Sequence, residues 1–181
     1  MNKRLFCIHI MSIAFTAITF AQSIGVRTSG TMWLTATPNV EINCVVGKRV
    51  SLHLPVLYNP FKFNDNSRFQ QLTVMPGARY WLQSPHTNWF ISAYGIASRF
   101  HVGGWMNHKY RYDGRCFGGG IGGGYSWILG KRINVEMEVG VGAGYADYDK
   151  CGWKSNSRNY GNERGFRIFP AKFDVSFNYL F

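Results

Sequence analysis

The C-terminal segment 169–181 alternates between two kinds of residue. One set of alternate positions is apolar and mostly aromatic: Phe169, Ala171, Phe173, Val175, Phe177, Tyr179 and Phe181. The positions between them are mostly polar: Pro170, Lys172, Asp174, Ser176 and Asn178. A period of two places successive side chains on opposite faces of a β-strand, so this segment predicts a strand with one apolar and one polar face.

The same pattern recurs along the chain and predicts eight strands, at 24–35, 40–46, 50–58, 72–82, 89–102, 117–129, 133–147 and 169–181. The content of 21 glycines and 17% aromatic residues favours strands over helices. An even strand number suits a closed antiparallel sheet, so we expect an all-β, eight-stranded, up-and-down barrel. Pro55 and Pro76 fall inside two of these strands, and we expect bulges there because proline cannot donate a ladder hydrogen bond.

The connections differ in length between the two ends of the predicted barrel. One end has short turns at 47–49, 84–88 and 130–132, and the other has long polar loops at 59–70, 103–115 and 148–165. A further tight turn at 37–39 joins the first two strands. This asymmetry is typical of transmembrane barrels of bacterial outer membranes, which have short periplasmic turns and longer extracellular loops.

The end of the chain resembles the signal that the barrel-assembly machinery of outer membranes recognises, a last strand of alternating aromatic residues that ends in Phe. Phe177, Tyr179 and Phe181 would form this signal here. The expected partners are therefore the assembly machinery, outer-membrane lipids and lipopolysaccharide.

The N-terminus has the features of a secretory signal peptide. Lys3 and Arg4 precede an apolar run over 5–20, and small residues at the end of this run favour cleavage after Ala21. The alternative, a membrane anchor, is disfavoured because a spanning helix needs about 20 apolar residues. We therefore expect a signal peptide at 1–21, an outer-membrane barrel domain at 22–181, and export to the cell outer membrane.

Aromatic residues gather near both ends of the predicted strands, as they do at the two interfaces of membrane barrels. The expected outer belt is Trp33, Tyr58, Phe100, Phe117 and Tyr145, and the expected periplasmic belt is Tyr80, Trp81, Trp89, Trp127 and Tyr179. In a soluble barrel these rings would more often form a core. A soluble, lipocalin-like ligand binder is therefore an alternative, although its pocket would be mostly apolar.

The polar face of the predicted strands gathers charges of both signs: Arg27, Glu41, Arg79, Glu136, Glu138, Lys172 and Asp174. An eight-stranded barrel is just wide enough for side chains to fill it. Unpaired buried charge is costly, so we expect these groups to pair inside, with Arg99 or His53 as a fourth cation. The sequence thus predicts a polar plug, not a channel.

Several segments resemble a small family of outer-membrane proteins of Bacteroides-type bacteria whose function is unknown. The resemblance lies in 33–39 (WLTATPN), 58–61 (YNPF), 77–82 (GARYWL), 125–129 (YSWIL) and 144–150 (GYADYDK). It covers nearly all of the chain after the signal. The resemblance implies an outer-membrane barrel and no established activity.

No arrangement of residues indicates catalysis strongly. Ser51 and His53 share a strand face near Glu41, which would suit an outer-membrane lipid-modifying hydrolase, but a satisfied interior histidine is the better interpretation. Glycines at 118, 120 and 123 match a dinucleotide spacing only formally, because no helix follows them. We predict no enzyme activity, no metal and no cofactor, and instead a structural or surface-interaction role.

The long loops combine basic and aromatic residues. Their candidate contact residues are Lys109, Arg111, Arg115, Lys150, Lys154 and Arg158. On an exported barrel these would meet lipopolysaccharide phosphates, an acidic glycan or a surface protein, and not nucleic acid. Three cysteines follow the signal, and the sequence leaves open whether Cys116 and Cys151 form a disulfide or all three are unrelated thiols.

Overall fold

The computed structural model describes residues 24–64, 67–103, 110–152 and 159–181. These form ten strands and one short helix: β1 (Ile24–Ser29), α2 (Gly30–Leu34), β2 (Asn39–Val45), β3 (Val50–Asn59), β4 (Lys62–Asn64), β5 (Ser67–Val74), β6 (Gly77–Trp81), β7 (Asn88–Gly103), β8 (Tyr110–Ile128), β9 (Ile133–Gly152) and β10 (Asn159–Leu180). The fold is all-β, as the sequence predicts, and every strand pair is antiparallel.

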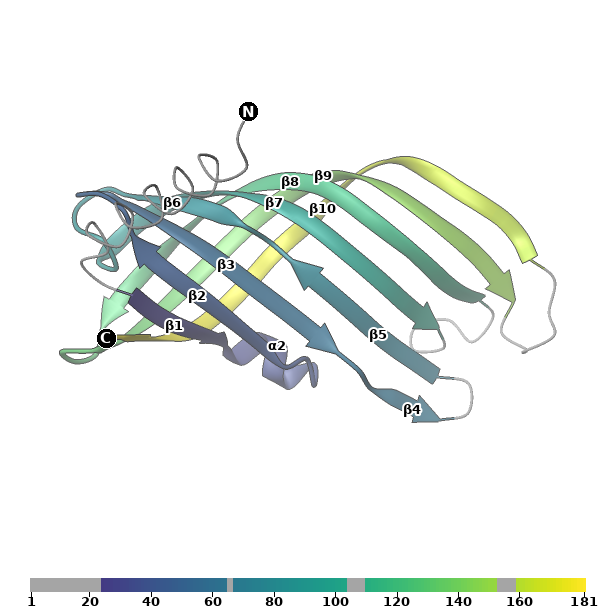
Figure 1. Cartoon of the computed structure of the whole chain (residues 1–181), viewed down its shortest axis with the longest axis horizontal. Helices are drawn as coiled ribbons and strands as arrows, with labels where there is room; N and C mark the ends of the chain where they lie inside the picture. The colour runs from purple at the N-terminus through teal and green to yellow at the C-terminus, as the bar shows by residue number, and fades with distance from the viewer. Residues whose placement is uncertain (1–23, 65–66, 104–109, 153–158) are drawn as a thin grey trace, which may run out of the picture.

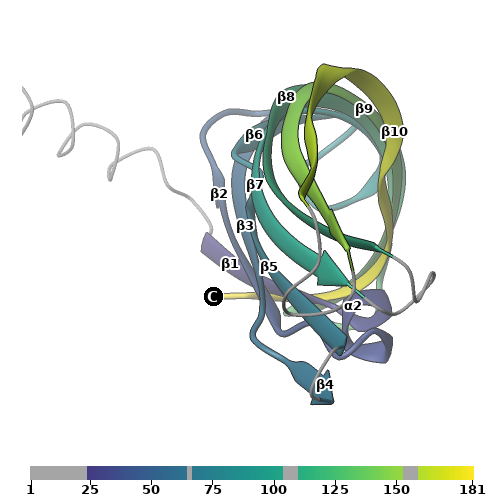
Figure 2. The ribbon, with the colours of Figure 1, turned by 90° about the vertical axis from the view of Figure 1, so that its right-hand side faces the viewer.

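The strands close into an eight-stranded barrel (Figures 1 and 2). Around the barrel the order is β1, β2, β3, β5 with β6, β7, β8, β9 and β10, and β10 pairs with β1 through Gly25–Leu180 to Ser29–Ser176. β5 and β6 are the two halves of one strand between β3 and β7. β4 is an extra short strand that pairs only with β5 among the described strands.

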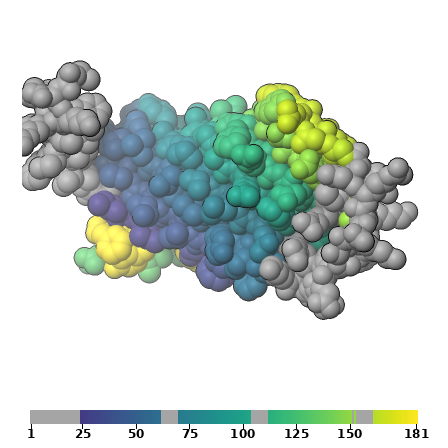
Figure 3. Space-filling model, turned by 45° about the vertical axis from the view of Figure 1, so that its right-hand side comes forward, coloured from purple at the N-terminus to yellow at the C-terminus, as the bar shows by residue number. Residues whose placement is uncertain are grey.

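The short turns and the C-terminus lie at one end of the barrel, which we call the proximal end; the opposite end is the distal end (Figure 1, left and right). Figure 3 shows residues of β10 in yellow at both ends of the molecule, because this strand crosses its whole length. β8, β9 and β10 extend much farther distally than β1 and β2 (Figure 1). Most of the segments predicted as loops are therefore strand, and that part of the prediction is wrong.

The two prolines do not produce the predicted bulges. On one side of the β5–β6 strand the register runs from Val56–Val74 to His53–Gly77 without a shift, and the register with β7 is equally continuous. Pro55 and Pro76 occupy the short interval where the ladder is interrupted. The carbonyl of Pro55 still accepts a bond from the Met75 nitrogen (3.1 Å), and the carbonyl of Pro76 accepts one from the Gly95 nitrogen (2.8 Å). Each proline therefore removes one backbone donor from the ladder but does not shift the register of the strands.

The β9–β10 ladder has two register shifts, one near its distal end between Asn159 and Gly161 and one within the barrel wall between Pro170 and Lys172. Ala171 is the additional residue, and a bulge reverses which face each residue takes on its far side. The shift turns Phe169 and Ala171 into the barrel interior, whereas the strict alternation predicts them on the outward face. Lys172 and Asp174 face inward, as the sequence predicts.

The predicted first strand, 24–35, is wrong beyond Ser29. There the chain turns into α2, and the Ser29 hydroxyl caps this helix by accepting a bond from Met32 N (3.2 Å). The side chain of Asn39 bonds both backbone groups of Ser29, at 2.6 Å to its nitrogen and 3.2 Å to its oxygen. These side-chain bonds replace the strand ladder, as Ser and Asn often do at helix caps and turns.

Glycines on β8 and β9 make room for large side chains of β7. A Cβ built on Gly120 would lie 2.5 Å from the ring of Tyr94, whereas one on Gly123, which faces outward, meets nothing closer than 3.5 Å. The narrow interior therefore accepts the Tyr94 ring only because Gly120, its cross-strand neighbour on β8, has no side chain.

We expect Gly120→Ala to destabilise the barrel by roughly 1–3 kcal/mol, because the added methyl forces the Tyr94 ring out of its position. Gly123→Ala is the matched control on the same strand and should change stability by no more than about 0.5 kcal/mol. Urea unfolding followed by tryptophan fluorescence measures both. Equal effects of the two variants would contradict this account of the interior packing.

Candidate functional site: the barrel interior

A layer of buried charge crosses the proximal half of the barrel and connects five strands. Arg27 of β1 is 1% exposed, and its Nη2 lies 2.8 Å from Asp174 Oδ2 of β10. Its Nη1 lies 3.2–3.4 Å from a carboxylate oxygen of each of Glu138, Glu136 and Glu41. Its Nε also donates to the hydroxyl of Ser176. One guanidinium thus contacts carboxylates from β2, β9 and β10.

Glu138 of β9 is the acceptor on which the other cations converge. Arg79 of β6 donates to it at 3.0 Å, and Lys172 of β10 donates at 2.9 Å. Ser92 of β7 adds a hydroxyl donor at 2.8 Å. Arg79 also bonds Glu41 at 2.7 Å, which ties β6 to β2. Charge-assisted bonds of this kind satisfy groups that could not otherwise leave water.

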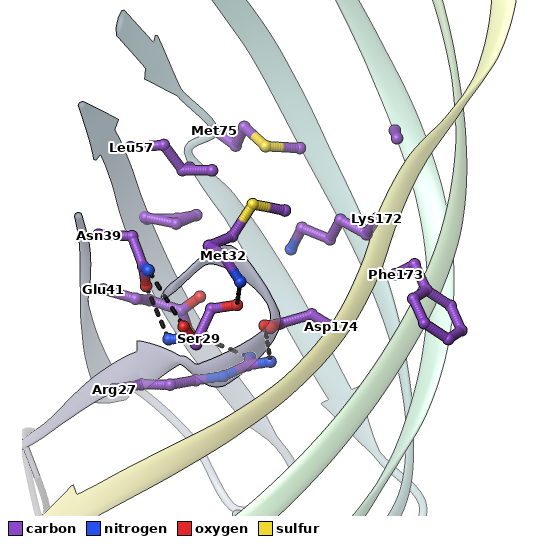
Figure 4. Close-up of a pocket in the computed structure, with 12 residues that line it drawn as sticks. Arg27, Ser29, Met32, Asn39, Glu41, Leu57, Met75, Lys172, Phe173 and Asp174 are labelled. Atoms are coloured by element: carbon purple, nitrogen blue, oxygen red, sulfur yellow. Dashed lines mark hydrogen bonds and ion pairs between the residues drawn. The ribbon is translucent and has the colours of Figure 1, made fainter. Parts of the chain in front are cut away.

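All seven charged residues that the sequence places in the interior lie in this layer. Figure 4 shows Arg27, Glu41, Lys172 and Asp174 converging from the wall, whereas Phe173 points away from the interior. Of the two candidates for a fourth cation, Arg99 lies on the outward face of β7, so its predicted interior position is wrong. His53 lies inside, 3% exposed.

The proximal end is closed by a second cluster that the sequence did not indicate. Trp81 is fully buried, with its indole nitrogen 2.9 Å from Ser51 Oγ and its ring against Phe90. The turn after β6 folds into the barrel so that the carbonyl of His86 accepts bonds from Ser126 (2.9 Å) and Asn134 (2.8 Å). The residues of a turn that folds into the lumen do not alternate between apolar and polar positions, so the alternation used to predict the strands could not reveal this cluster.

The hydrolase hypothesis for Ser51, His53 and Glu41 receives no support from geometry. The Ser51 hydroxyl is bonded by Trp81, and neither ring nitrogen of His53 has a hydrogen-bond partner in the described structure. A nucleophile and its base must lie within hydrogen-bonding reach of each other. These residues are not arranged as a triad.

A cavity of about 520 Å³ occupies the distal half of the barrel. Met75 and Ile96 line its apolar floor and form a buried cluster with Tyr94, and Leu57, Phe169 and Ala171 pack against this cluster. Met32 of α2 projects between the cavity and a smaller pocket of about 50 Å³ above the charged layer (Figure 4). The interior is therefore charged proximally and apolar distally.

The outward face of the distal strands carries a network of charged and polar residues. Asp147 accepts bonds from Asn162 (2.8 Å) and Arg164 (3.3 Å), and these donors hold the pKa of its carboxyl below the usual value. On the opposite, inward-facing side of the same two strands, Tyr148 donates to Glu163 at 2.6 Å, and this bond raises the pKa of the Tyr148 hydroxyl. The network links β9 and β10 beyond the level where the predicted loops would begin.

Two of the six candidate contact residues have described side chains, Arg115 and Lys150. Arg115 is exposed on β8 and lines a polar pocket with Arg164 and Asp147. Lys150 of β9 is half-buried. The side chain of Arg111 and the residues Lys109, Lys154 and Arg158 lie outside the described residues.

The structure excludes the Cys116–Cys151 disulfide. Cys116 is a free, buried thiol, and its cross-strand neighbour on β9 is Ala146. The backbone of Cys151 is opposite Arg111 instead, five positions along the ladder. That offset corresponds to roughly 17 Å along a strand, well beyond the ~7 Å that a disulfide can bridge between Cα atoms.

Eight of the ten predicted belt aromatics are exposed: Trp33, Tyr58, Phe117, Tyr145, Tyr80, Trp89, Trp127 and Tyr179. The prediction is wrong for two of them: Trp81 is buried in the cluster that closes the proximal end, and Phe100 lines the distal cavity. The three residues of the C-terminal signal, Phe177, Tyr179 and Phe181, are all exposed on the outward face.

The fold and its interior define a small closed β-barrel with a charged proximal layer and an open distal half. A family model described as "Protein of unknown function (DUF3575)" matches residues 5–181, and the chain belongs to this family. Searches among curated proteins and among solved structures gave no match. The resemblance inferred from the sequence is thus confirmed at the level of the family, whereas the Bacteroides-type origin stays a prediction. The described part of the chain contains no helix of sufficient length and apolar character to cross a membrane.

We expect Arg79→Met to destabilise the barrel by roughly 3–5 kcal/mol, because it leaves Glu41 and Glu138 with less compensating charge in a buried site. Arg49→Met, at an exposed turn residue, is the matched control and should have little effect. The urea midpoint of the folded barrel measures both. A change of less than about 1 kcal/mol for Arg79→Met would show that the layer does not hold the wall together.

Proposed function

We propose that the protein is an integral barrel of the outer membrane, with a structural role and with its distal strands as an interaction surface. Three features support the proposal: an apolar outward band, charged rims on both sides of it, and an interior in which buried charges are paired. The apolar band is the observation that carries it.

The outward face of the wall is apolar over a continuous band. On β9 every second residue from Ile133 to Tyr145 belongs to it, including Val139, which is 48% exposed. This stretch is roughly 40 Å along the strand, or ~30 Å perpendicular to a membrane at the usual tilt of 35–45°. The hydrocarbon core of a bilayer has the same thickness, about 30 Å.

The band ends at a similar level on three adjacent distal strands. Within two residues, Phe117 gives way to Arg115 on β8, Tyr145 to Asp147 on β9, and Phe166 to Arg164 on β10. At the proximal end the turns supply Lys48, Arg49, Lys131 and Arg132. Such a sharp change from apolar to charged side chains favours an interface between hydrocarbon and head groups.

An exposed apolar band of this size on a soluble monomer would promote aggregation. In a bilayer the same surface is solvated by lipid, and the closed ladder leaves few backbone groups unpaired. Export would depend on the N-terminal signal, and insertion on recognition of Phe177, Tyr179 and Phe181 by the barrel-assembly machinery. Beyond the band, the network around Asp147 and Arg164 would face lipopolysaccharide, a surface glycan or another surface protein.

Val139→Lys tests the membrane location, because Val139 lies at the middle of the band. In a bilayer we expect a loss of folding stability of roughly 2–4 kcal/mol, since a lysine at the midplane must leave water. In a soluble barrel the same exposed position should tolerate lysine within about 0.5 kcal/mol. Equilibrium folding into lipid vesicles, followed by gel mobility, measures the change.

Val46→Lys is the matched control, because Val46 is also exposed but lies beside the proximal turn. At the interface a lysine should cost about 0–1 kcal/mol. A Val139→Lys effect no larger than that of Val46→Lys would contradict the membrane proposal and favour a soluble ligand-binding barrel.

A further inference from the structure

The barrel wall is incomplete beside the distal cavity. β1 pairs with β10 only as far as Ser29–Ser176, and α2 then contacts β10 through Thr31, whose hydroxyl bonds the carbonyl of Phe173 (3.3 Å). Over 166–172, the edge of β10 that faces away from β9 has no strand partner in the described chain. Both margins of this break line the cavity, with Met32, Thr35 and Thr37 on one side and Arg167 and 169–171 on the other.

The cavity walls offer carbon surface and few free polar groups. The hydroxyls of Thr73 and Ser98 bond each other at 2.7 Å, and Gln71 donates to Thr73 at 2.8 Å. Thr37 is bonded by Asn59 at 3.0 Å. Apart from these satisfied groups, the floor is the apolar cluster around Met75 and Ile96. Such a wall suits an apolar occupant, and the volume falls within the ~300–1,000 Å³ of small-molecule sites.

One charged group stands at the distal rim of the cavity. Arg167 lines it, is exposed, and lies opposite Gly144, next to the level of Tyr145 where the outward apolar band ends. Its side chain also bonds Tyr148, but it forms no ion pair with a carboxylate of the described residues. A positive group at the height of lipid head groups, above an apolar cavity, matches a molecule with an anionic head and one hydrocarbon chain.

We propose that the distal cavity binds one acyl chain of an anionic amphiphile, which enters sideways through the break between α2 and β10 and places its head group against Arg167. The sideways entry rests on the proposed membrane location; the cavity and its charge do not. A free fatty acid and a lipid acyl chain share this chemistry.

A photoactivatable fatty acid tests the proposal. The probe carries a diazirine near the end of its chain and is irradiated with the folded, full-length mature barrel in lipid nanodiscs, and adducts are mapped by peptide mass spectrometry. We expect adducts on cavity residues such as Met75 and Phe169. Adducts on the outward residues Val139 and Ile121 report ordinary contact with bilayer lipid and serve as the reference.

Ala146→Trp fills the cavity, because Ala146 faces into it from β9. Cavity adducts should then fall by about tenfold or more relative to the outward adducts, whereas Ala143→Trp, on the outward face of the same strand, should leave them unchanged. Retention of the heat-modified gel shift shows that each variant is folded. Equal cavity labelling in both variants, or adducts confined to the outward face in the native barrel, would overturn the proposal.

Arg167→Gln gives a second test that does not change the shape of the cavity floor. Cavity labelling by the fatty acid should weaken by about tenfold, and labelling by its uncharged alcohol analogue should stay the same, because only the former pairs with the guanidinium. An equal response to the two probes would overturn the role of Arg167. Solvent extraction of the barrel isolated from membranes identifies the source of the bound chain. Recovery of a free fatty acid or of a lipid supports the site, and the absence of both from the extract would contradict it. Failure of the membrane proposal alone would remove the outward adducts but not the cavity adducts.

Discussion

The paired charges inside the proximal half of the barrel are the contacts on which the wall depends. Glu138 of β9 accepts from Arg79 and Lys172 and lies 3.2 Å from Arg27, so side chains from β1, β6 and β10 meet at one carboxylate. Removing one charge from such a group leaves the others buried without compensation. The layer therefore fixes which strands lie opposite each other across the lumen, in addition to the ladder that joins neighbours.

The division of the interior into two halves follows from this layer. Proximal to it, Trp81 and the inward-folded turn at His86 fill the lumen. Distal to it, Met75, Tyr94 and Ile96 end the packing, and the space above them stays open because β1 gives way to α2 while β10 continues. The short first strand thus produces both the cavity and the break in the wall that leads to it.

The strand count, the parity and the inward charges followed from the sequence because a period of two is a local property of each strand. The bulge at Ala171 was not predictable, since nothing in the alternation of 169–181 shows where a ladder shifts. The helix at 30–34 was missed because its determinants, the Ser29 cap and the Asn39 side chain, compete with a strand pattern that continues through it. The sequence predicts loops at the distal strand segments because their outward residues are polar, and polar residues there interrupt the alternation of apolar and polar positions on which the strand prediction depends.

The central claim is that the closed barrel lies in the outer membrane, and its most direct test is the gel mobility of the protein in isolated outer membranes, with and without boiling. A folded barrel resists detergent, so the account predicts that the protein is found in this fraction and that its mobility shifts on boiling. Recovery from the soluble periplasmic fraction, without a shift on boiling, would contradict it.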